Sequence, residues 1–140
     1  MFNHGDTGAR RVLTEDEYFE LTGQIIDASI TVHKEMGPGL LESVYEHCLM
    51  KEFELRNIRA VRQVELPLIY RGHRLNKTYS IDILVEDAVI LEIKSAEAIN
   101  PLFEAQLLSY LKLTNKKIGY LLNFNVPLMK NGIKRLKNGF

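Results

Sequence analysis

The chain contains 140 residues with a mass of 16.1 kDa, which is the size of one compact domain. Apolar residues make up 46% of the sequence and charged residues 26%, so the composition excludes an intrinsically disordered or fibrous protein. The single cysteine, Cys48, excludes an intrachain disulfide and a cysteine-based zinc site. No apolar stretch approaches the ~18 residues that span a bilayer, and residues 1–11 are too polar for a signal peptide. We therefore expect a cytoplasmic protein with no membrane partner.

The formal net charge is zero, but the two signs are distributed unevenly along the chain. Residues 1–100 contain 11 basic and 17 acidic residues, whereas residues 101–140 contain seven basic residues and a single acid, Glu104. A basic segment of this kind is typical of a phosphate-binding face, and equally of a solvated lysine-rich surface. The charge pattern alone leaves both interpretations open.

Two helices are predicted before any strand. Thr14 and Glu17 form a capping-box pattern, and apolar residues at helical spacing follow it, which predicts a helix over about 14–36. The segment Gly37-Pro38-Gly39 ends that helix, and a second amphipathic run predicts another helix that stops near Asn57. The apolar face of the second helix is predicted to consist of Leu41, Val44, Tyr45, Cys48, Leu49 and Phe53.

From Val64 onward a period of two replaces the helical spacing. The alternation over 64–70 predicts a strand, and Pro67 places this strand at a sheet edge because proline donates no ladder hydrogen bond. The remaining predicted elements are a turn at 71–73, a strand over 75–85, a tight connection at 86–87, a buried strand over 88–91, a helix from Pro101 to about Thr114 with Asn100 as its N-cap, and an apolar strand over 118–124. Residues 130–140 are compatible with either a short helix or a strand.

This order of elements, two helices, a three-strand meander, a helix and a strand, predicts an α/β or α+β fold in which helices flank a mixed sheet. No repeat or flexible linker interrupts the chain, so we expect one domain over residues 1–140, with residues 1–13 as a flexible N-terminal segment.

Two acids and a lysine fall on neighbouring predicted strands. Asp82 lies late in one strand, and Glu92 and Lys94 close the next, so a tight turn would bring the acids together. Because side chains alternate along a strand, Glu92 and Lys94 share one face while Ile93 enters the packed side. Two carboxylates, with the backbone carbonyl of Ile93, suit a hard divalent cation such as Mg²⁺. Lys94 beside the ion would orient or deprotonate a water, or stabilise charge on a phosphate.

Three further side chains are candidates for the same site. Gln106 and Tyr110 are four residues apart on one helical face, where an amide could hold water or phosphate and a phenol could support it. Glu42 opens the second predicted helix and could supply a third carboxylate. Each also has a structural explanation: a surface amide, a half-buried tyrosine, and an acid that favours the helix dipole. Spacing alone does not separate these alternatives.

The stretch from Gly39 to Tyr45 resembles the motif that names the GxxExxY protein family, with Glu42 as its acid. The resemblance extends from about Ile25 to Gly139 and implies the PD-(D/E)xK nuclease superfamily, with a restriction-endonuclease-like core. Carried over to matching positions, it implies the roles that follow: Asp82 and Glu92 as metal-binding acids, Lys94 as the motif lysine, Gln106 and Tyr110 as the Q-x-x-x-Y element of RecB-like exonucleases, and Glu42 as the helix-borne acid. Members of the family often carry a histidine where this chain has Phe103, so any role for an imidazole there is absent.

The leading hypothesis is therefore a Mg²⁺- or Mn²⁺-dependent nuclease that acts on DNA or RNA. Its basic segment would supply sequence-independent contacts to the nucleic-acid backbone from Lys112, Lys116, Lys117, Lys130, Lys134, Arg135 and Lys137. The alternative is a non-catalytic module that binds nucleic acid or a protein partner and retains a nuclease-like fold. A homodimer formed through apolar surface on the first helix is a third possibility.

Overall fold

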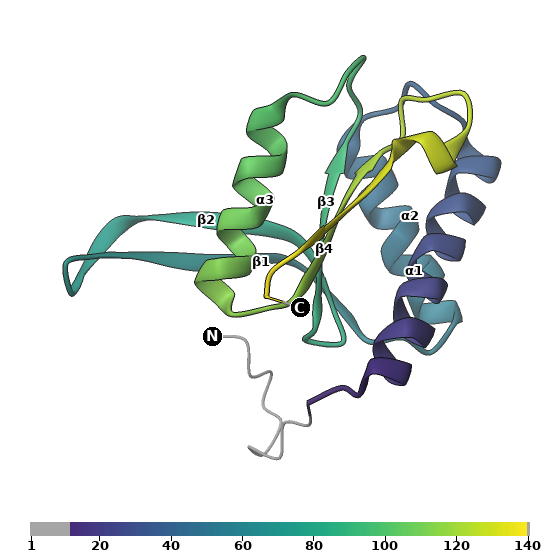
Figure 1. Cartoon of the computed structure of the whole chain (residues 1–140). Coiled ribbons are helices and arrows are strands. Elements are labelled where there is room, and N and C mark those ends of the chain that lie inside the picture. Colours follow the sequence, from purple (N-terminus) through teal and green to yellow (C-terminus); the bar gives the residue numbers. More distant parts are fainter. Residues whose placement is uncertain (1–11, 140) are drawn as a thin grey trace.

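The computed structural model describes residues 12–139, so most of the predicted flexible segment, residues 1–13, lies outside the described part of the chain. The described residues form three α-helices, five strands and one short 3-10 turn (Figure 1). In chain order these elements are α1 (Glu15–Met36), α2 (Glu42–Leu55), β1 (Ala60–Tyr70), β2 (His73–Val85), β3 (Val89–Lys94), α3 (Pro101–Thr114), β4 (Ile118–Asn123), η1 (Met129–Gly132) and β5 (Ile133–Lys137). None of the described helices is both long and apolar enough to cross a membrane.

The five strands form one mixed sheet in the order β1-β2-β3-β4-β5. The first three strands are an antiparallel meander, β4 runs parallel to β3, and β5 pairs antiparallel with β4. This arrangement confirms the predicted fold class, the meander and the edge position of β1. The chain end that the sequence left undecided forms both candidate structures, the short turn η1 and the edge strand β5.

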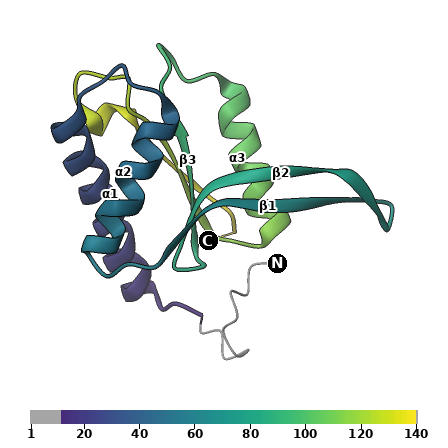
Figure 2. The ribbon, with the colours of Figure 1, turned by 180° about the vertical axis from the view of Figure 1, so that it is seen from behind.

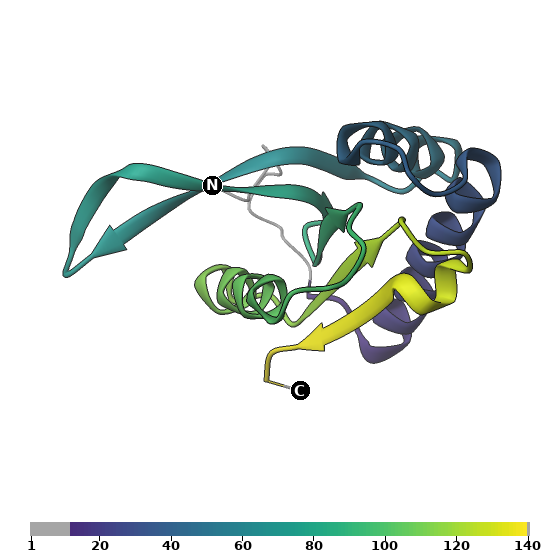
Figure 3. The same cartoon turned by 90° about the horizontal axis from the view of Figure 1, so that it is seen from above.

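Helices cover both faces of the sheet, as the view from above shows (Figure 3). On one face α1 and α2 pack against Ile83, Leu91 and Ile93, and on the other face α3 packs against Ile90 and Leu121. Because helices cover both faces, nearly all residues of β3 and β4 are buried, and both strands are mostly apolar.

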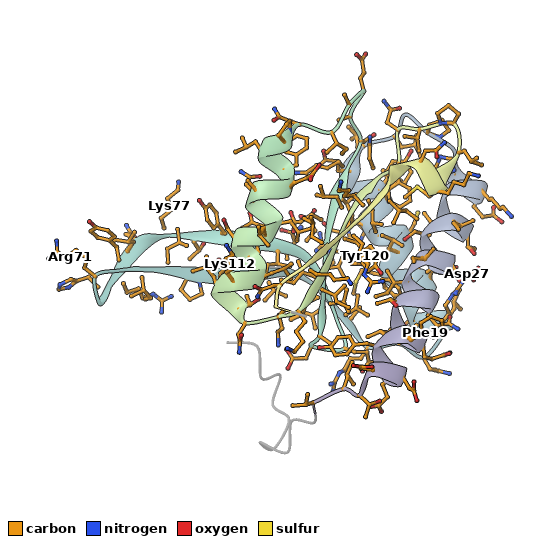
Figure 4. All side chains as sticks on the ribbon, viewed as in Figure 1. Phe19, Asp27, Arg71, Lys77, Lys112 and Tyr120 are labelled. Carbon is orange, nitrogen blue, oxygen red and sulfur yellow. The ribbon has the colours of Figure 1, made fainter. Side chains whose placement is uncertain are left out.

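Local signals account for most element boundaries. Thr14 and Glu17 form the predicted capping box of α1, and the Asn100 side chain caps α3. At the second helix one prediction was wrong: Leu41 does not join the apolar face, because it is the N-cap of α2 and is 74% exposed. On α1 most apolar residues lie in the core, and the large exposed exceptions are Phe19 at 80% (Figure 4) and Met36 at 40%.

The first two strands extend well beyond the rest of the sheet. Strand β3 pairs with β2 only over residues 83–85, whereas β1 and β2 pair with each other out to Tyr70 and His73. The outer part of this pair, residues 66–79, projects away from the helices in two opposite views (Figures 1 and 2). We call these residues the β1–β2 arm.

Candidate active site

The predicted acid pair lies where the regular β2–β3 ladder ends. The ladder's last pair is Ile83 with Leu91, and beyond it carboxylates take the place of backbone acceptors. The Asp82 N–H donates to Glu92 Oε2 at 3.0 Å, and the Ile93 N–H donates to Asp82 Oδ2 at 2.8 Å. The two carboxylates are therefore held side by side, because each accepts a hydrogen bond from a backbone N–H of the other's strand.

Asp82 also lies where β2 changes the face that it presents. Ile81 packs in the core cluster under α3, whereas Ile83, two residues later, packs in the cluster under α1 and α2. Strict alternation would place both on one face, so the strand turns between them. On the facing strand Gln63 has a φ of 52°, a left-handed conformation that marks the same irregularity. This turn, which the sequence pattern did not reveal, positions the carboxylate of Asp82 at the site.

Burial and like charge oppose ionisation of both acids. Burial, followed by the charge of Asp82, raises the pKa of Glu92 to about 8. Burial likewise raises the pKa of Asp82, with further contributions from the negative charges of Glu46 and Glu42. The ammonium of Lys94 acts in the opposite direction on both acids, though more weakly. A second positive charge at this position would stabilise the ionised pair.

Lys94 lies on the same side of β3 as Glu92, as predicted. Side chains alternate along the strand, and Ile93 between them points to the opposite face, into the core. The Lys94 ammonium lies 4.4 Å from the centroid of the Phe103 ring, and within residues 12–139 it forms no ion pair with either site acid. An ammonium over an aromatic face is held by the ring quadrupole. Phe103 thus restricts the position of the Lys94 ammonium.

Helix α3 contributes one of its two predicted residues directly. Tyr110 is only 8% exposed, and its ring lies 5.4 Å from that of Tyr79 at the root of the arm. Burial, followed by the charge of Glu92, raises the pKa of Tyr110 to about 12, so the phenol lies near the acid pair and stays protonated. Gln106 lies one turn earlier on α3, is exposed, and has no hydrogen bond within the described part of the chain.

Tyr45, the tyrosine of the GxxExxY stretch, fixes the loop before α2. The Tyr45 hydroxyl donates to the Gly37 carbonyl at 2.5 Å and accepts from the Leu40 N–H at 3.0 Å. The Ser95 hydroxyl, directly after β3, donates to the Leu40 carbonyl at 2.6 Å. These bonds join the loop to the end of the strand that carries the second site acid.

Glu42 follows this loop in the first turn of α2, where it is exposed. Its charge raises the pKa of both Asp82 and Glu92, so it faces the pair from the helix side. Over residues 12–139, however, no three His, Cys, Asp or Glu side chains lie close enough together to hold a metal ion. The structure therefore brings two of the three predicted acids into direct proximity, with Glu42 as a more distant neighbour.

Sequence reasoning missed Glu46, which is only 4% exposed and lies one helical turn after Glu42. Its carboxylate accepts from Arg62 at 2.6 Å and from the Gln63 amide at 2.7 Å. The same Gln63 amide lies 3.5 Å from Asp82 Oδ1, so the network joins α2 to the first acid through β1. An acid on the buried face of an amphipathic helix was the available signal, because such a group requires a partner.

The seven basic residues predicted to contact nucleic acid do not form one cluster. Lys112, Lys116 and Lys117 lie at the C-terminal end of α3, opposite to the end that carries Phe103. Lys116 is mostly buried and forms an ion pair with Asp87 at 3.2 Å. The other four follow η1 and β5, at the sheet edge farthest from β1: Lys130, Lys134, Arg135 and Lys137.

Comparison with known families gives one match, to a family model described as the PD-(D/E)XK nuclease superfamily, over residues 19–136. The matched region contains the acid pair, Lys94 and all three helices apart from the first turn of α1. A search for curated relatives found no match. The mixed five-stranded sheet flanked by helices is consistent with a restriction-endonuclease-like fold.

Proposed function

The chain belongs to the PD-(D/E)XK nuclease superfamily, and we propose that it is a divalent-metal-dependent nuclease that hydrolyses phosphodiester bonds. The observation that carries the proposal is the reciprocal pairing of Asp82 and Glu92, with Lys94 on the same face of β3. Within the superfamily we assign the chain to the GxxExxY family, because Gly39, Glu42 and Tyr45 occupy the motif positions around the loop that abuts β3.

The donor set fits Mg²⁺ or Mn²⁺. Hard divalent cations bind carboxylate and carbonyl oxygens and retain several waters, so two protein carboxylates suffice. Asp82 and Glu92 would hold the ion with the backbone carbonyl of Ile93, and Glu42 would act from the helix side. When bound, the ion supplies positive charge that stabilises the developing charge on the phosphate. The two buried carboxylates repel each other when both are ionised, so binding of a cation between them would be favourable.

The residues around the pair suit hydrolysis. In this reaction a water oxygen bonds to phosphorus and gives up a proton, a P–O bond breaks, and the departing oxygen takes up a proton. Lys94 would orient the water or stabilise the phosphate charge, and its position over Phe103 restricts where the ammonium can reach. Gln106 is exposed and free to hold water or phosphate, and Tyr110 would support it from the helix.

A second candidate function is a binding module that keeps the nuclease fold without turnover. One observation favours it: the described residues contain no group of three metal-ligating side chains, so the site relies on two acids. In either case nucleic acid is the proposed partner, with contacts from the exposed cations of the C-terminal segment: Lys112, Lys130, Lys134, Arg135 and Lys137.

The test is cleavage of labelled single- and double-stranded DNA and RNA with Mg²⁺ or Mn²⁺. We expect Asp82→Asn and Lys94→Gln to abolish cleavage, because each removes one chemical group with little change in shape. Glu35→Gln, a change of an exposed acid on α1, is the matched control and should cleave normally. Cleavage that survives in both site variants means that the site is misassigned. A wild-type protein that neither cleaves nor gains thermal stability from millimolar metal supports the binding module.

A further inference from the structure

We propose that the β1–β2 arm is a DNA-binding ribbon that enters the major groove of duplex DNA and guides the duplex to the acid pair. The inference rests on the proposed function, because it names the surface that would receive the substrate of that site. It is carried by three features of the arm: its charge, its free edges and its continuity with Asp82.

The arm is a cationic stretch that contains no acid. Residues 66–79 contain Arg71, Arg74 and Lys77 with no Asp or Glu, whereas residues 1–100 as a whole contain 17 acids and 11 basic residues. All three cations are exposed. Figure 4 shows Arg71 at the tip and Lys77 along the arm, away from the body of the protein. A local excess of positive charge on a projecting element is the arrangement expected for contacts to phosphates.

The arm is a two-stranded ribbon that contacts α3 at its root, where Leu66 is buried and Tyr79 lies against Tyr110, and its outer end at residues 69–74 is exposed. From Leu66 to Tyr79 its two strands pair with each other, and β3 joins β2 only from Ile83 onward. The tip is a two-residue turn, Arg71-Gly72, with both φ angles positive, which matches the twist of the flanking strands. The major groove of B-DNA, about 12 Å wide, admits a two-stranded β-ribbon, whereas the deep, narrow groove of A-form RNA does not.

The arm exposes apolar side chains, and this exposure does not stabilise the free protein. Ile69 and Tyr70 are 61% and 63% exposed, and an isolated two-stranded hairpin is marginally stable in water. A second copy of the chain is a poorer occupant than DNA, because Pro67 removes a backbone donor from the edge of β1 and the arm cations repel their counterparts. Apolar side chains between cations instead suit the groove, where they contact thymine methyl groups.

The arm is also continuous with the site. Strand β2 extends from His73 to Val85, with one shift of register where it faces Pro67 and Ile69, and it carries Asp82 near its inner end. At ~3.4 Å per residue, Arg74 lies ~27 Å along the strand from Asp82, which corresponds to ~8 base pairs of duplex. At the root, Tyr79 contacts Tyr110, whose phenol lies near the acids. DNA seated on the arm would therefore extend to the acid pair.

The test measures binding rather than cleavage. A labelled 24-base-pair duplex is titrated with protein in EDTA across a series of salt concentrations, and affinity is read by fluorescence anisotropy. The arm variant is Arg71→Asn/Arg74→Gln/Lys77→Gln, in which asparagine also suits the left-handed turn position. If the three cations contact phosphates, the slope of log K against log salt falls by about 2 to 3 and affinity at 0.1 M salt falls ~100-fold. The control Lys34→Gln/Lys51→Gln/Arg59→Gln removes the same charge from exposed positions on the body and should bind as wild type.

A shortened variant provides a second reading. An Asn-Gly turn replaces residues 67–78 and joins Leu66 to Tyr79, which are already paired in register, so the root of the hairpin is retained. This variant should also lose duplex binding. Unchanged affinity and salt slope in both arm variants would overturn the proposal, as would equal dependence on the arm for double-stranded RNA, or a wild-type protein that binds no duplex.

Two further measurements separate the alternatives. Light scattering that shows a wild-type dimer and monomeric arm variants would assign the arm to self-association and overturn DNA docking. Because binding is measured without metal, the outcome is independent of turnover: loss of binding in the arm variants supports the proposal even if no cleavage is found. Conversely, if the protein cleaves DNA and the arm variants bind it as wild type does, the proposed nuclease function stands and the proposed role of the arm is wrong.

Discussion

Glu92 is expected to make the metal-free protein less stable as the pH rises through neutrality. Its pKa in the folded protein is about 8, against an ordinary value of 4.5, because burial and the charge of Asp82 oppose ionisation. A folded-state pKa above the unfolded value means that the folded protein binds the proton more tightly. The resulting stabilisation is fully present below about pH 4.5 and is lost as the pH rises through 8.

The magnitude follows from the same difference. A shift from 4.5 to about 8 corresponds to at most ~5 kcal/mol between the two ends of this range. Asp82 shares the titration, so the loss belongs to the pair and is spread over several pH units. Glu92→Gln keeps the shape and the acceptor for the Asp82 N–H but carries no charge. We expect this variant to lose most of the pH dependence and to be more stable than wild type at pH 8.

The measurement is chemical denaturation of the metal-free protein at intervals between pH 5 and 8.5. Glu35→Gln, an exposed acid on α1, is the control and should follow the wild-type curve. Millimolar Mg²⁺ should raise the Tm of wild type more at pH 8 than at pH 6, because the ion competes with the proton for the pair. The same addition should leave Glu92→Gln nearly unchanged. A variant whose stability falls with pH as steeply as wild type would refute the coupling of this acid pair.

Three other predictions concern stability and are measured by urea denaturation. Tyr45→Phe removes two hydrogen bonds from the loop before α2 and should lower the free energy of unfolding by ~1–3 kcal/mol. Tyr120→Phe should be neutral or stabilising, because that buried hydroxyl has no partner within the described structure. Equal losses in the two variants would contradict this. Gly23→Ala, in open space on α1, should stabilise the protein by ~0.5–1 kcal/mol. Gly119→Ala should destabilise it by ~1–3 kcal/mol, because the new Cβ would lie 2.9 Å from a leucine methyl of α3. The reverse order would show that α3 shifts to make room at little cost. Glu46→Ala leaves an arginine and a glutamine of β1 without their acceptor and should cost ~2–4 kcal/mol, so a neutral result would show that the network is dispensable.

The acid pair was predictable because it depends on local geometry. A tight connection at Glu86 and Asp87 pairs Val85 with Val89, and counting outward along both strands brings Asp82 opposite Glu92. Capping signals placed the helix ends for the same reason, because each depends on residues three or four positions apart. Such features require no knowledge of distant contacts.

Features that depend on distant contacts were not predictable. The helical spacing places Glu46 on the buried face of α2, but it does not identify Arg62 and Gln63 of β1 as the donors to its carboxylate. The alternation over 64–70 correctly predicts a strand, but Tyr70 is exposed because, among residues 12–139, no third strand or helix reaches the outer end of the pair. A period of two indicates which residues share a face and not whether anything covers that face.

Strand β2 combines two features that oppose the stability of the free protein. Its inner end contributes to a buried pair of like charges, and its outer end belongs to a hairpin with exposed apolar side chains and three cations. Both are relieved by the components of one complex, since a divalent cation neutralises the acids and a polyanion neutralises the arm. In the proposed complex, DNA bound at the arm would bring its phosphates towards the cation, because both positions lie on one strand. The proposal thus gives one physical explanation for both unfavourable features of β2, since each would be offset by a component of the same complex.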